Sequence, residues 1–226
     1  MFALNVYALS AACASVWGAL RLRRMGRRGR AHVLTALNAL LLGVNAVKYA
    51  LPPLLGRGWS IPVEFSSVAY FTTPAIVIMY EENSRARCWA AYSALMAGFF
   101  YYLAMSLAGE VIYGEEPPLE MHVSMLCHGL LLLTGMTLLL TERYASDCWP
   151  LLAVGTASVA AWALLLRPVA DRGGRLLIYL LLDARPAEGL LPERAVPLWY
   201  VAVAVLLLCS EGLFMAINRA AARKFE

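Results

Sequence analysis

The chain has 226 residues, of which 61% are hydrophobic and 15% charged, with a mean hydropathy of +0.65 and a formal net charge of +4. Soluble domains are about 45–50% apolar and about 25% charged, so a soluble fold has too little interior to bury this much apolar surface. The surplus is expected to face lipid, where ~20 residues make one spanning helix. The composition therefore predicts an all-α integral membrane protein, a bundle of about seven transmembrane helices forming a single domain over 1–226, without a soluble domain.

Charged runs, glycines and prolines divide the chain into seven apolar stretches. The predicted spans are 2–20, 33–55, 62–80, 89–108, 121–141, 150–166 and 196–217. A further apolar stretch at 176–182 is too short to span and is interpreted as a re-entrant or interfacial segment. A signal peptide carries its positive charge before the apolar core. Here the basic run from Arg21 to Arg30 follows the first stretch, so that stretch is expected to be a true span with the N-terminus outside.

The basic residues also predict the orientation and the location. With the N-terminus outside and the C-terminus inside, twelve of the 19 Lys and Arg residues fall on the inner side and six on the outer side. This asymmetry is typical of cytoplasmic loops and favours a multi-pass protein of the cell membrane, expected to be a bacterial cytoplasmic membrane. The basic run lacks the interleaved aromatics and motifs of nucleic-acid binding. Membrane lipids are therefore the expected partners, and nucleic acid is not.

Motifs for cofactors and metals are not found. The five cysteines show no CxxC spacing and predict neither a disulfide framework nor a zinc site. The sequence contains no Walker loop, dinucleotide glycine motif, GxSxG or HExxH. We therefore expect no cofactor and no metal.

Ionisable residues inside the predicted spans are the strongest functional signal, because each charge there costs roughly 2.5–3.5 kcal/mol. Lys48, Glu64 and His128 all fall in the outer half, and Glu211 lies nearer the inner face. Each also has a structural interpretation: a snorkelling lysine, a boundary glutamate, a neutral histidine bonded between helices, and a structural partner for Glu211. Three such residues on separate helices at one depth favour a common site, and we expect Lys48, Glu64 and His128 to line one outward-opening cavity.

Three neighbours complete the predicted site. Asn45 is a neutral companion of Lys48, and Ser124 shares the helix face of His128 because the two are four residues apart. Tyr179 lies in the outer loop, which is either a solvated loop or a lid over the cavity.

Several stretches resemble motifs of the YwaF-like integral membrane proteins of bacteria, in the same order along the chain. Ile61-Pro62-Val63-Glu64-Phe65-Ser66 is similar to the Leu-Pro-Leu-His-Leu-Cys motif. Cys127-His128-Gly129-Leu130 resembles the Tyr-His-Gly segment, and Tyr179 to Pro186 with Pro197-Leu198-Trp199-Tyr200 resembles the Asn-Tyr-x-x-Leu and Trp-Pro-Trp-Tyr elements. The resemblance covers about residues 33 to 220. It implies kinship with the transmembrane protein 164 acyltransferases and, more distantly, with the androgen-induced hydrolases of fatty-acid esters.

The resemblance implies chemistry on lipid acyl groups by an intramembrane nucleophile and a histidine, which His128 matches in position. The nucleophile does not carry over. Val63 stands where the eukaryotic acyltransferases have a cysteine, and Glu64 and Ser66 stand where the bacterial motif has histidine and cysteine. Ser66, Thr72 or Ser124 would have to serve as the nucleophile with His128 as the base.

Two functions remain open from the sequence. The first is hydrolysis or transfer of lipid acyl groups at the outer leaflet, with His128 as general base, Glu64 orienting it or polarising water, and Lys48 holding a headgroup. The second is a non-catalytic carrier, or a subunit of a membrane partner protein, that uses Lys48 and Glu64 as a substrate or proton site. Homo-oligomerisation is left open by both.

Overall fold

The structure is a computed structural model that describes residues 2–56, 61–113, 118–170, 183 and 196–223. Within these residues the chain is helical and contains no strand. The α-helices are α1 (Phe2–Arg23), α2 (Arg27–Leu54), α3 (Phe65–Met79), α4 (Arg85–Tyr113), α5 (Pro118–Thr141), α6 (Trp149–Ala170) and α8 (Val196–Arg223), with a 3₁₀ turn η1 (Ser146–Cys148) before α6. The all-α fold predicted from composition is confirmed.

Five stretches of the described chain are helical, long and apolar enough to cross a membrane. They are Arg27–Leu54, Arg85–Leu107, Met121–Thr141, Ser146–Ala170 and Val196–Ala221. The apolar helix α3 has 15 residues and falls short of that length, and α1 is not among the five. The predicted short segment at 176–182 lies outside the described residues.

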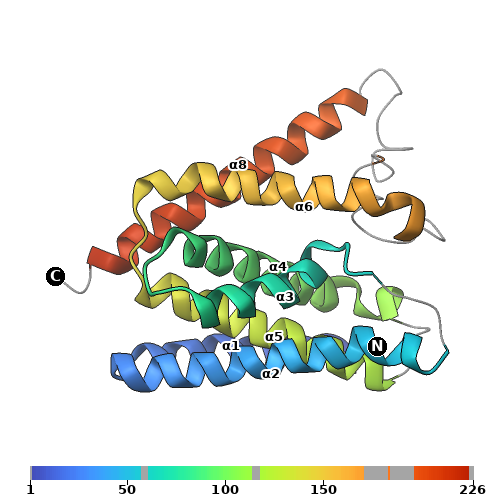
Figure 1. Ribbon diagram of the computed structural model, residues 1–226, viewed down its shortest axis with the longest axis horizontal. Coiled ribbons are helices and arrows are strands. Elements are labelled where there is room, and N and C mark those ends of the chain that lie inside the picture. Colours follow the sequence, from blue (N-terminus) through green and yellow to red (C-terminus); the bar gives the residue numbers. More distant parts are fainter. Residues whose placement is uncertain (1, 57–60, 114–117, 171–182, 184–195, 224–226) are drawn as a thin grey trace.

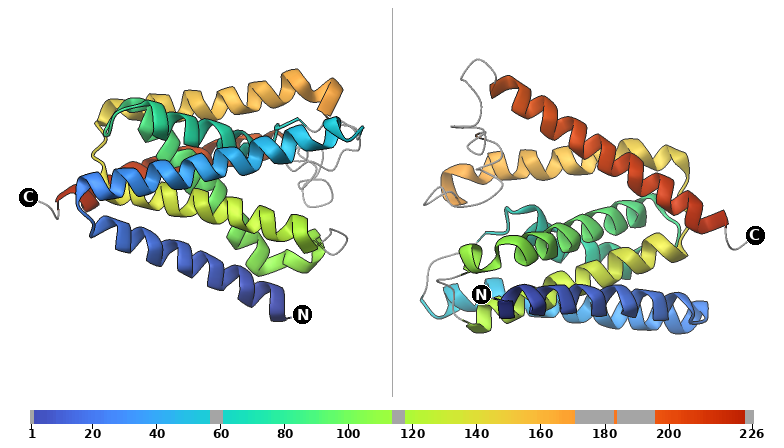
Figure 2. Two further views of the ribbon diagram at one scale, coloured as in Figure 1. Left: turned by 60° about the horizontal axis from the view of Figure 1, so that its bottom comes forward. Right: turned by 180° about the vertical axis from the view of Figure 1, so that it is seen from behind.

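The helices form a main bundle of α1 to α5, over which α6 and α8 lie as a second group (Figure 1). Helix α5 is central, because it contacts α1, α2, α3, α4 and α8. Helix α8 crosses α6 obliquely, and its N-terminal half diverges from the bundle (Figure 2). The start of α1 and the end of α8 lie at opposite ends of the molecule.

The closest helix pair is α4 with α5, and glycines allow its short separation. A Cβ atom on Gly135 of α5 would lie 2.4 Å from the backbone nitrogen of Leu95, and one on Gly98 of α4 would lie 2.7 Å from the backbone nitrogen of Leu132. One and a half turns beyond, a Cβ on Gly129 would meet the Tyr102 hydroxyl at 2.9 Å. Small residues let helix backbones approach in lipid, where the hydrophobic effect does not drive helices together.

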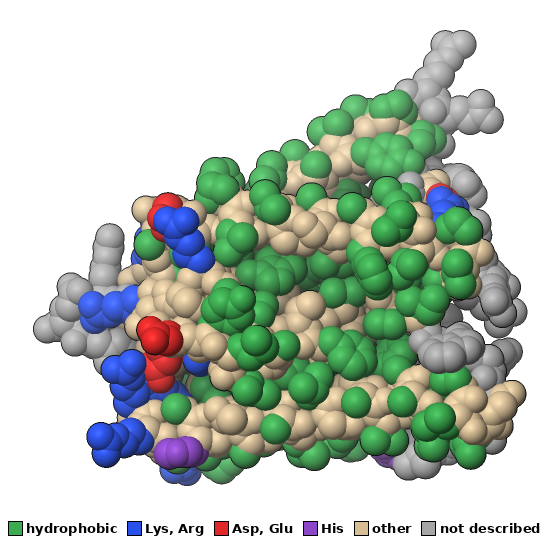
Figure 3. Space-filling view, viewed as in Figure 1, with side chains coloured by type: hydrophobic (Ala, Val, Ile, Leu, Met, Phe, Trp, Pro, Cys, Tyr) green, Lys and Arg blue, Asp and Glu red, His purple; other side chains and the backbone are tan. Residues whose placement is uncertain are grey.

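The outer surface of the bundle is apolar along its length, and most of its charges lie at one end. Large apolar side chains are exposed on many of the helices, and α6 and α8 are mostly unburied, with 17% of each spanning window buried against 61% for α5. Figure 3 shows hydrophobic side chains over the middle of the helices, with most of the visible Lys, Arg, Asp and Glu at the end where α8 terminates and a smaller charged group at the opposite end. The end where α8 terminates carries the ion pairs Arg27–Glu82 and Arg85–Asp147. This distribution is what a bilayer requires of a protein that crosses it.

A buried ion pair organises the charged end. Arg87 at the start of α4 and Glu142 just after α5 are 2.7 Å apart, with side-chain exposures of 8% and 3%. Glu142 also accepts hydrogen bonds from the backbone N–H of Asn83 (2.9 Å) and the Tyr144 hydroxyl (3.2 Å). A buried ion pair is stable only when further hydrogen bonds satisfy its remaining atoms, and here these bonds join the α3–α4 loop to the α5–α6 connection.

Helix α8 is tied to the same end through Asn218. Its side-chain amide donates to the carbonyl oxygens of Leu139 (2.9 Å) and Glu142 (2.8 Å), and its oxygen accepts from the backbone N–H of Tyr144 (3.1 Å). These carbonyls lie where α5 ends and lack helical partners of their own. Asn218 therefore caps α5 while it holds α8 in place.

The close α4–α5 contact predicts that Gly135→Ala lowers the thermal stability of the purified protein. The new methyl would overlap the Leu95 backbone, and overpacking of this kind costs about 1–3 kcal/mol. The matched control is Gly212→Ala in α8, where an added Cβ meets nothing within 4 Å and alanine gains helix propensity. Melting in detergent followed by size exclusion measures both. Equal melting temperatures for the two variants would contradict the close contact.

The stability of the folded protein is expected to depend on pH through Glu142. Burial raises the pKa of its carboxyl, while the Arg87 guanidinium and the hydrogen bonds from Asn83 and Tyr144 act in the opposite direction. The folded state therefore holds this proton more tightly than the unfolded chain. The resulting stability is fully present below the usual pKa of about 4.3 and is lost as the pH rises through the raised value.

The measurement is the difference in melting temperature between the wild type and Glu142→Gln, followed from pH 4 to pH 8. We expect the wild type to lose its advantage as the pH rises, because the variant has no proton to release at this position. An advantage that grows with pH would show that the Arg87 charge outweighs the effect of burial.

Candidate functional site

His128 on α5 is buried, at 5% exposure, and its protonation pattern can be inferred from its neighbours. Its Nδ1 atom lies 2.8 Å from the backbone carbonyl oxygen of Ser124. A carbonyl oxygen only accepts, so Nδ1 carries the hydrogen and Nε2 carries the lone pair. The Tyr70 hydroxyl oxygen of α3 lies 2.7 Å from Nδ1 and 3.0 Å from Nε2. Because Nδ1–H is donated to Ser124, Nε2 is the ring nitrogen that can accept a hydrogen bond from the Tyr70 hydroxyl.

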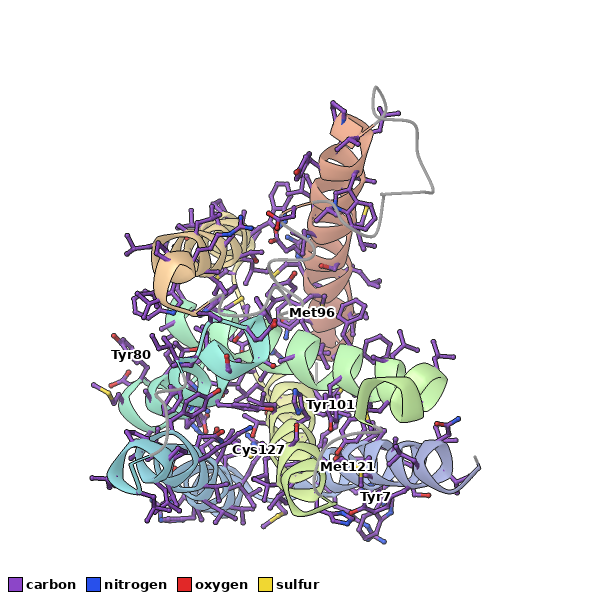
Figure 4. The ribbon with its side chains drawn as sticks, turned by 90° about the vertical axis from the view of Figure 1, so that its right-hand side faces the viewer. Tyr7, Tyr80, Met96, Tyr101, Met121 and Cys127 are labelled. Carbon is purple, nitrogen blue, oxygen red and sulfur yellow. The ribbon has the colours of Figure 1, made fainter. Side chains whose placement is uncertain are left out.

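Two tyrosines hold the imidazole ring in place. Tyr101 of α4 stacks on it with a centroid distance of 3.5 Å and an interplanar angle of 8°, and Tyr70 meets it edge-on at 5.2 Å and 76°. Viewed along the bundle, Tyr101 lies where α4 passes α5 (Figure 4). The neighbouring Tyr102 hydroxyl donates to the Met125 carbonyl oxygen at 2.8 Å. The glycine-lined approach of α4 to α5 thus brings Tyr101 onto His128.

Lys48 of α2 lies near the same tyrosine. Its Nζ atom lies 5.9 Å from the ring centroid of Tyr70 and 5.9 Å from that of Tyr49, within cation–π range. The Lys48 residue is exposed, and no ion pair joins it to any residue in the described part of the chain. Tyr70 therefore lies near both the Lys48 ammonium and the His128 imidazole.

Asn45, one turn before Lys48, completes the buried part of the cluster. Its amide donates to the Leu41 carbonyl oxygen at 2.8 Å and to the Cys127 sulfur at 3.4 Å. Its own oxygen is buried and has no hydrogen-bond partner in the described residues. Cys127, labelled in Figure 4, thus faces α2 while its neighbour His128 faces α3 and α4.

Glu64 is the residue that precedes α3, and it lies near Tyr49. Its carbonyl oxygen accepts the Ser67 hydroxyl at 2.8 Å, and Ser67 in turn contacts the Tyr49 hydroxyl. The Glu64 carboxylate is close enough to Tyr49 to act on it electrostatically. No ion pair joins Glu64 to Lys48 in the described structure. Tyr49 therefore lies near both the Lys48 ammonium and the Glu64 carboxylate.

The three predicted nucleophiles differ in position. Ser66 is half-buried and forms no hydrogen bond with His128, as judged from the described side chains. Thr72 donates to the Val68 carbonyl oxygen at 3.1 Å, and Ser124 meets His128 through its backbone oxygen. The side-chain hydroxyl within hydrogen-bond distance of the His128 ring belongs to Tyr70.

Two other predicted positions lie elsewhere. Val63 is buried against Ala163 of α6, where Trp162 donates to the Pro62 carbonyl oxygen at 2.9 Å. Its side chain therefore belongs to the α6 contact and not to the His128 cluster. Tyr179 lies outside the described residues.

Sequence reasoning missed Tyr49, Tyr70 and Tyr101, which connect the predicted residues. The signal was present, because a tyrosine deep inside an apolar helix must find a partner for its hydroxyl. Tyr70 lies four residues after Ser66, on the same face of α3. Which hydroxyl reaches His128 depends on the packing of α3 against α5, which no local spacing predicts.

The described residues contain no group of three His, Cys, Asp or Glu side chains placed to hold a metal ion. No protein-family model matches the sequence, and no curated protein or solved structure is significantly similar to it. The chemistry of the site therefore has to be argued from its own residues.

The geometry predicts that His128 is the Nδ1–H tautomer in the folded protein. Imidazole ¹⁵N chemical shifts of detergent-solubilised protein measure this, and His128→Gln assigns the signals against His32 and His122, which are exposed. Tyr70→Phe should shift the Nε2 signal and leave the tautomer unchanged, because the Ser124 carbonyl sets it. An Nε2–H tautomer in the wild type would contradict the arrangement.

Proposed function

We propose that the protein is a multi-pass membrane enzyme that hydrolyses or transfers acyl groups of membrane lipids at the outer leaflet. In this proposal it is a relative of the YwaF-like proteins, with seven spans, the N-terminus outside, and a bacterial cytoplasmic membrane as its location. The gathering of described Arg residues at the end where α8 terminates supports this orientation. The location of the site in the outer half follows from the same orientation.

The observation that carries the proposal is a neutral imidazole bonded to a tyrosine hydroxyl, next to an ammonium group without an ion-pair partner in the described residues. Acid–base groups and a cation within one cluster are what an ester with an anionic headgroup requires. An isolated structural histidine needs no lysine beside it. The ammonium would bind phosphate or carboxylate oxygens by charge-assisted hydrogen bonds.

The reaction follows from the tautomer. Water, or the hydroxyl of an acceptor lipid, attacks the acyl carbonyl directly and passes its proton through the Tyr70 oxygen to Nε2 of His128. The leaving alkoxide takes a proton back along the same path, so that the pair ends as it began. Direct attack is the form supported here, because Ser66 is not hydrogen-bonded to His128. Tyr101 would hold the ring plane during both transfers.

His128→Gln should lower the rate of acyl release or transfer by roughly 10²–10⁴-fold, the usual contribution of a general base. The assay uses protein reconstituted in phosphatidylglycerol vesicles, with free fatty acid and acylated products measured by mass spectrometry. The matched control is His122→Gln, whose ring is exposed and contacts Tyr7. Equal turnover in His128→Gln and the wild type would end the proposal.

Lys48→Met should raise KM for phosphatidylglycerol about tenfold and leave kcat nearly unchanged, because a headgroup contact of about 1.4 kcal/mol is lost. A neutral diacylglycerol ester serves as the control substrate and should be unaffected. A fall in kcat for both substrates would place Lys48 in the chemical step and not in headgroup binding.

A non-catalytic carrier is the second candidate, and one observation favours it. No serine, threonine or cysteine side chain in the described structure is hydrogen-bonded to His128, as covalent acyl chemistry would require. A carrier would bind an anionic solute on Lys48 and a proton on Glu64. Uptake of an organic anion into proteoliposomes under a pH gradient, lost in Glu64→Gln, would support it over the enzyme. Uptake unchanged in that variant would exclude this mechanism.

A further inference from the structure

Glu211 of α8 is another buried ionisable group, on a helix that contributes no residue to the His128 cluster. It begins the buried stripe of α8, which continues through Phe214, Met215 and Asn218 toward the charged end. Its side chain is 1% exposed and faces Thr156 of α6. This is the place where α8 crosses α6 beside α4 (Figure 2). On the N-terminal side of Glu211, α8 diverges from the bundle. Glu211 is therefore the first buried residue of the interface that α8 forms with the other helices.

The hydroxyl groups around Glu211 have nearer acceptors than its carboxyl. Tyr92 of α4 lies 2.8 Å from Ser210, and Ser210 donates to the Leu207 carbonyl oxygen at 2.7 Å. Ser210 has only one proton, so Tyr92 is the donor between them. Thr156 also has only one proton, and two acceptors lie within its reach: the Leu152 carbonyl oxygen at 3.0 Å and the Oε1 atom of Glu211 at 3.4 Å.

The Glu211 carboxyl has few partners. Its Oε1 atom lies 3.4 Å from Thr156 Oγ1, and its Oε2 atom is buried with no partner in the described residues. An ionised carboxylate only accepts hydrogen bonds, so its one donor here would be the Thr156 hydroxyl, whose single proton the Leu152 carbonyl oxygen also attracts. A protonated carboxyl has one hydrogen to donate to Thr156 Oγ1, which leaves the Thr156 proton for Leu152.

No cation among the described residues compensates a negative charge at this position. Glu211 forms no ion pair with a described residue. Tyr92 on α4 is the titratable side chain placed against it, Thr156 on α6 and Ser210 on its own helix are the polar ones, and the stripe below it is apolar down to Asn218. An unpaired charge in apolar surroundings becomes neutral by binding a proton.

We propose that Glu211 is a proton-binding site at the junction of α4, α6 and α8. It holds one proton as a neutral carboxylic acid and donates it to Thr156 Oγ1. Loss of that proton would place a charge at the last packed turn of α8, beneath the half of the helix that leaves the bundle. The site is separate from the His128 cluster and does not depend on the activity proposed for it.

Infrared difference spectroscopy of the protein in lipid vesicles tests the proposal directly. The wild type at neutral pH should show the carbonyl stretch of a protonated carboxylic acid, absent in Glu211→Gln. Thr156→Val should keep this band and move it to higher frequency, because the hydrogen bond to Oγ1 is lost. Absence of the band in the wild type at pH 7, with a carboxylate band that disappears in Glu211→Gln, would overturn the proposal.

Chemical labelling supplies the independent measurement. Dicyclohexylcarbodiimide reacts with protonated carboxyls in apolar surroundings, and peptide mass spectrometry locates the adduct. We expect labelling at Glu211 that falls about tenfold per pH unit once the proton is removed, with Glu211→Gln as the control for labelling at other positions.

Sodium distinguishes a proton site from a metal-cation site. At constant pH, NaCl and choline chloride of equal ionic strength should give the same labelling and the same infrared band. Protection by Na⁺ alone, accompanied by the carboxylate band, would show that the ligand is a metal cation and overturn the assignment. Glu211→Gln should melt within a degree or two of the wild type, since a neutral amide replaces a neutral acid of similar shape.

Discussion

The contact between the backbones of α4 and α5 is the constraint on which the rest of the fold depends. Gly98 and Gly135 sit where any side chain would meet the opposing backbone, so the two helices approach without an intervening layer of side chains. In lipid this is how helices gain packing energy, because apolar side chains are as well solvated by the membrane as by each other. Helices α1, α2, α3 and α8 then pack around the central α5.

The same contact determines how the buried polar groups are satisfied. At the charged end, Arg87 and Glu142 meet where α4 begins and α5 ends, and the loops close around them. Toward the other end, the short α4–α5 separation places Tyr101 on His128, while α3 supplies Tyr70. The Arg87–Glu142 pair is charged and enclosed by hydrogen-bond donors, and it joins the loops at that end of the fold. The His128–Tyr70 pair is neutral and lies near the exposed Lys48, and it is the basis of the acid–base function proposed above.

Helix α8 differs from the rest because only its C-terminal half is packed. Its buried residues are Glu211, Phe214, Met215 and Asn218, one stripe that faces the charged end. Asn218 is fully hydrogen-bonded to α5 and the following loop, whereas Glu211 has one carboxyl oxygen without a partner. Helix α8 is therefore held by hydrogen bonds at its C-terminal end, and Glu211 lies at the other end of its packed stripe. A change in the charge of Glu211 would act on α8 at the point where its packing against the bundle ends.

The sequence alone determined the helical, lipid-facing class of the protein and pointed to Lys48, Glu64 and His128, because composition and the cost of burying charge are properties of the chain itself. It could not supply the contacts between them. Lys48 and Glu64 both lie near Tyr49 and form no ion pair with each other in the described structure, and the hydroxyl that contacts His128 belongs to Tyr70, not to Ser66. Likewise, the apolar stretch placed Glu211 inside a predicted span, where a structural partner is expected, but it could not show that one carboxyl oxygen has no partner in the described residues. Tertiary structure decided these points, since hydrogen-bond partners on separate helices depend on helix rotation and separation, which between α4 and α5 follow from the glycine contacts.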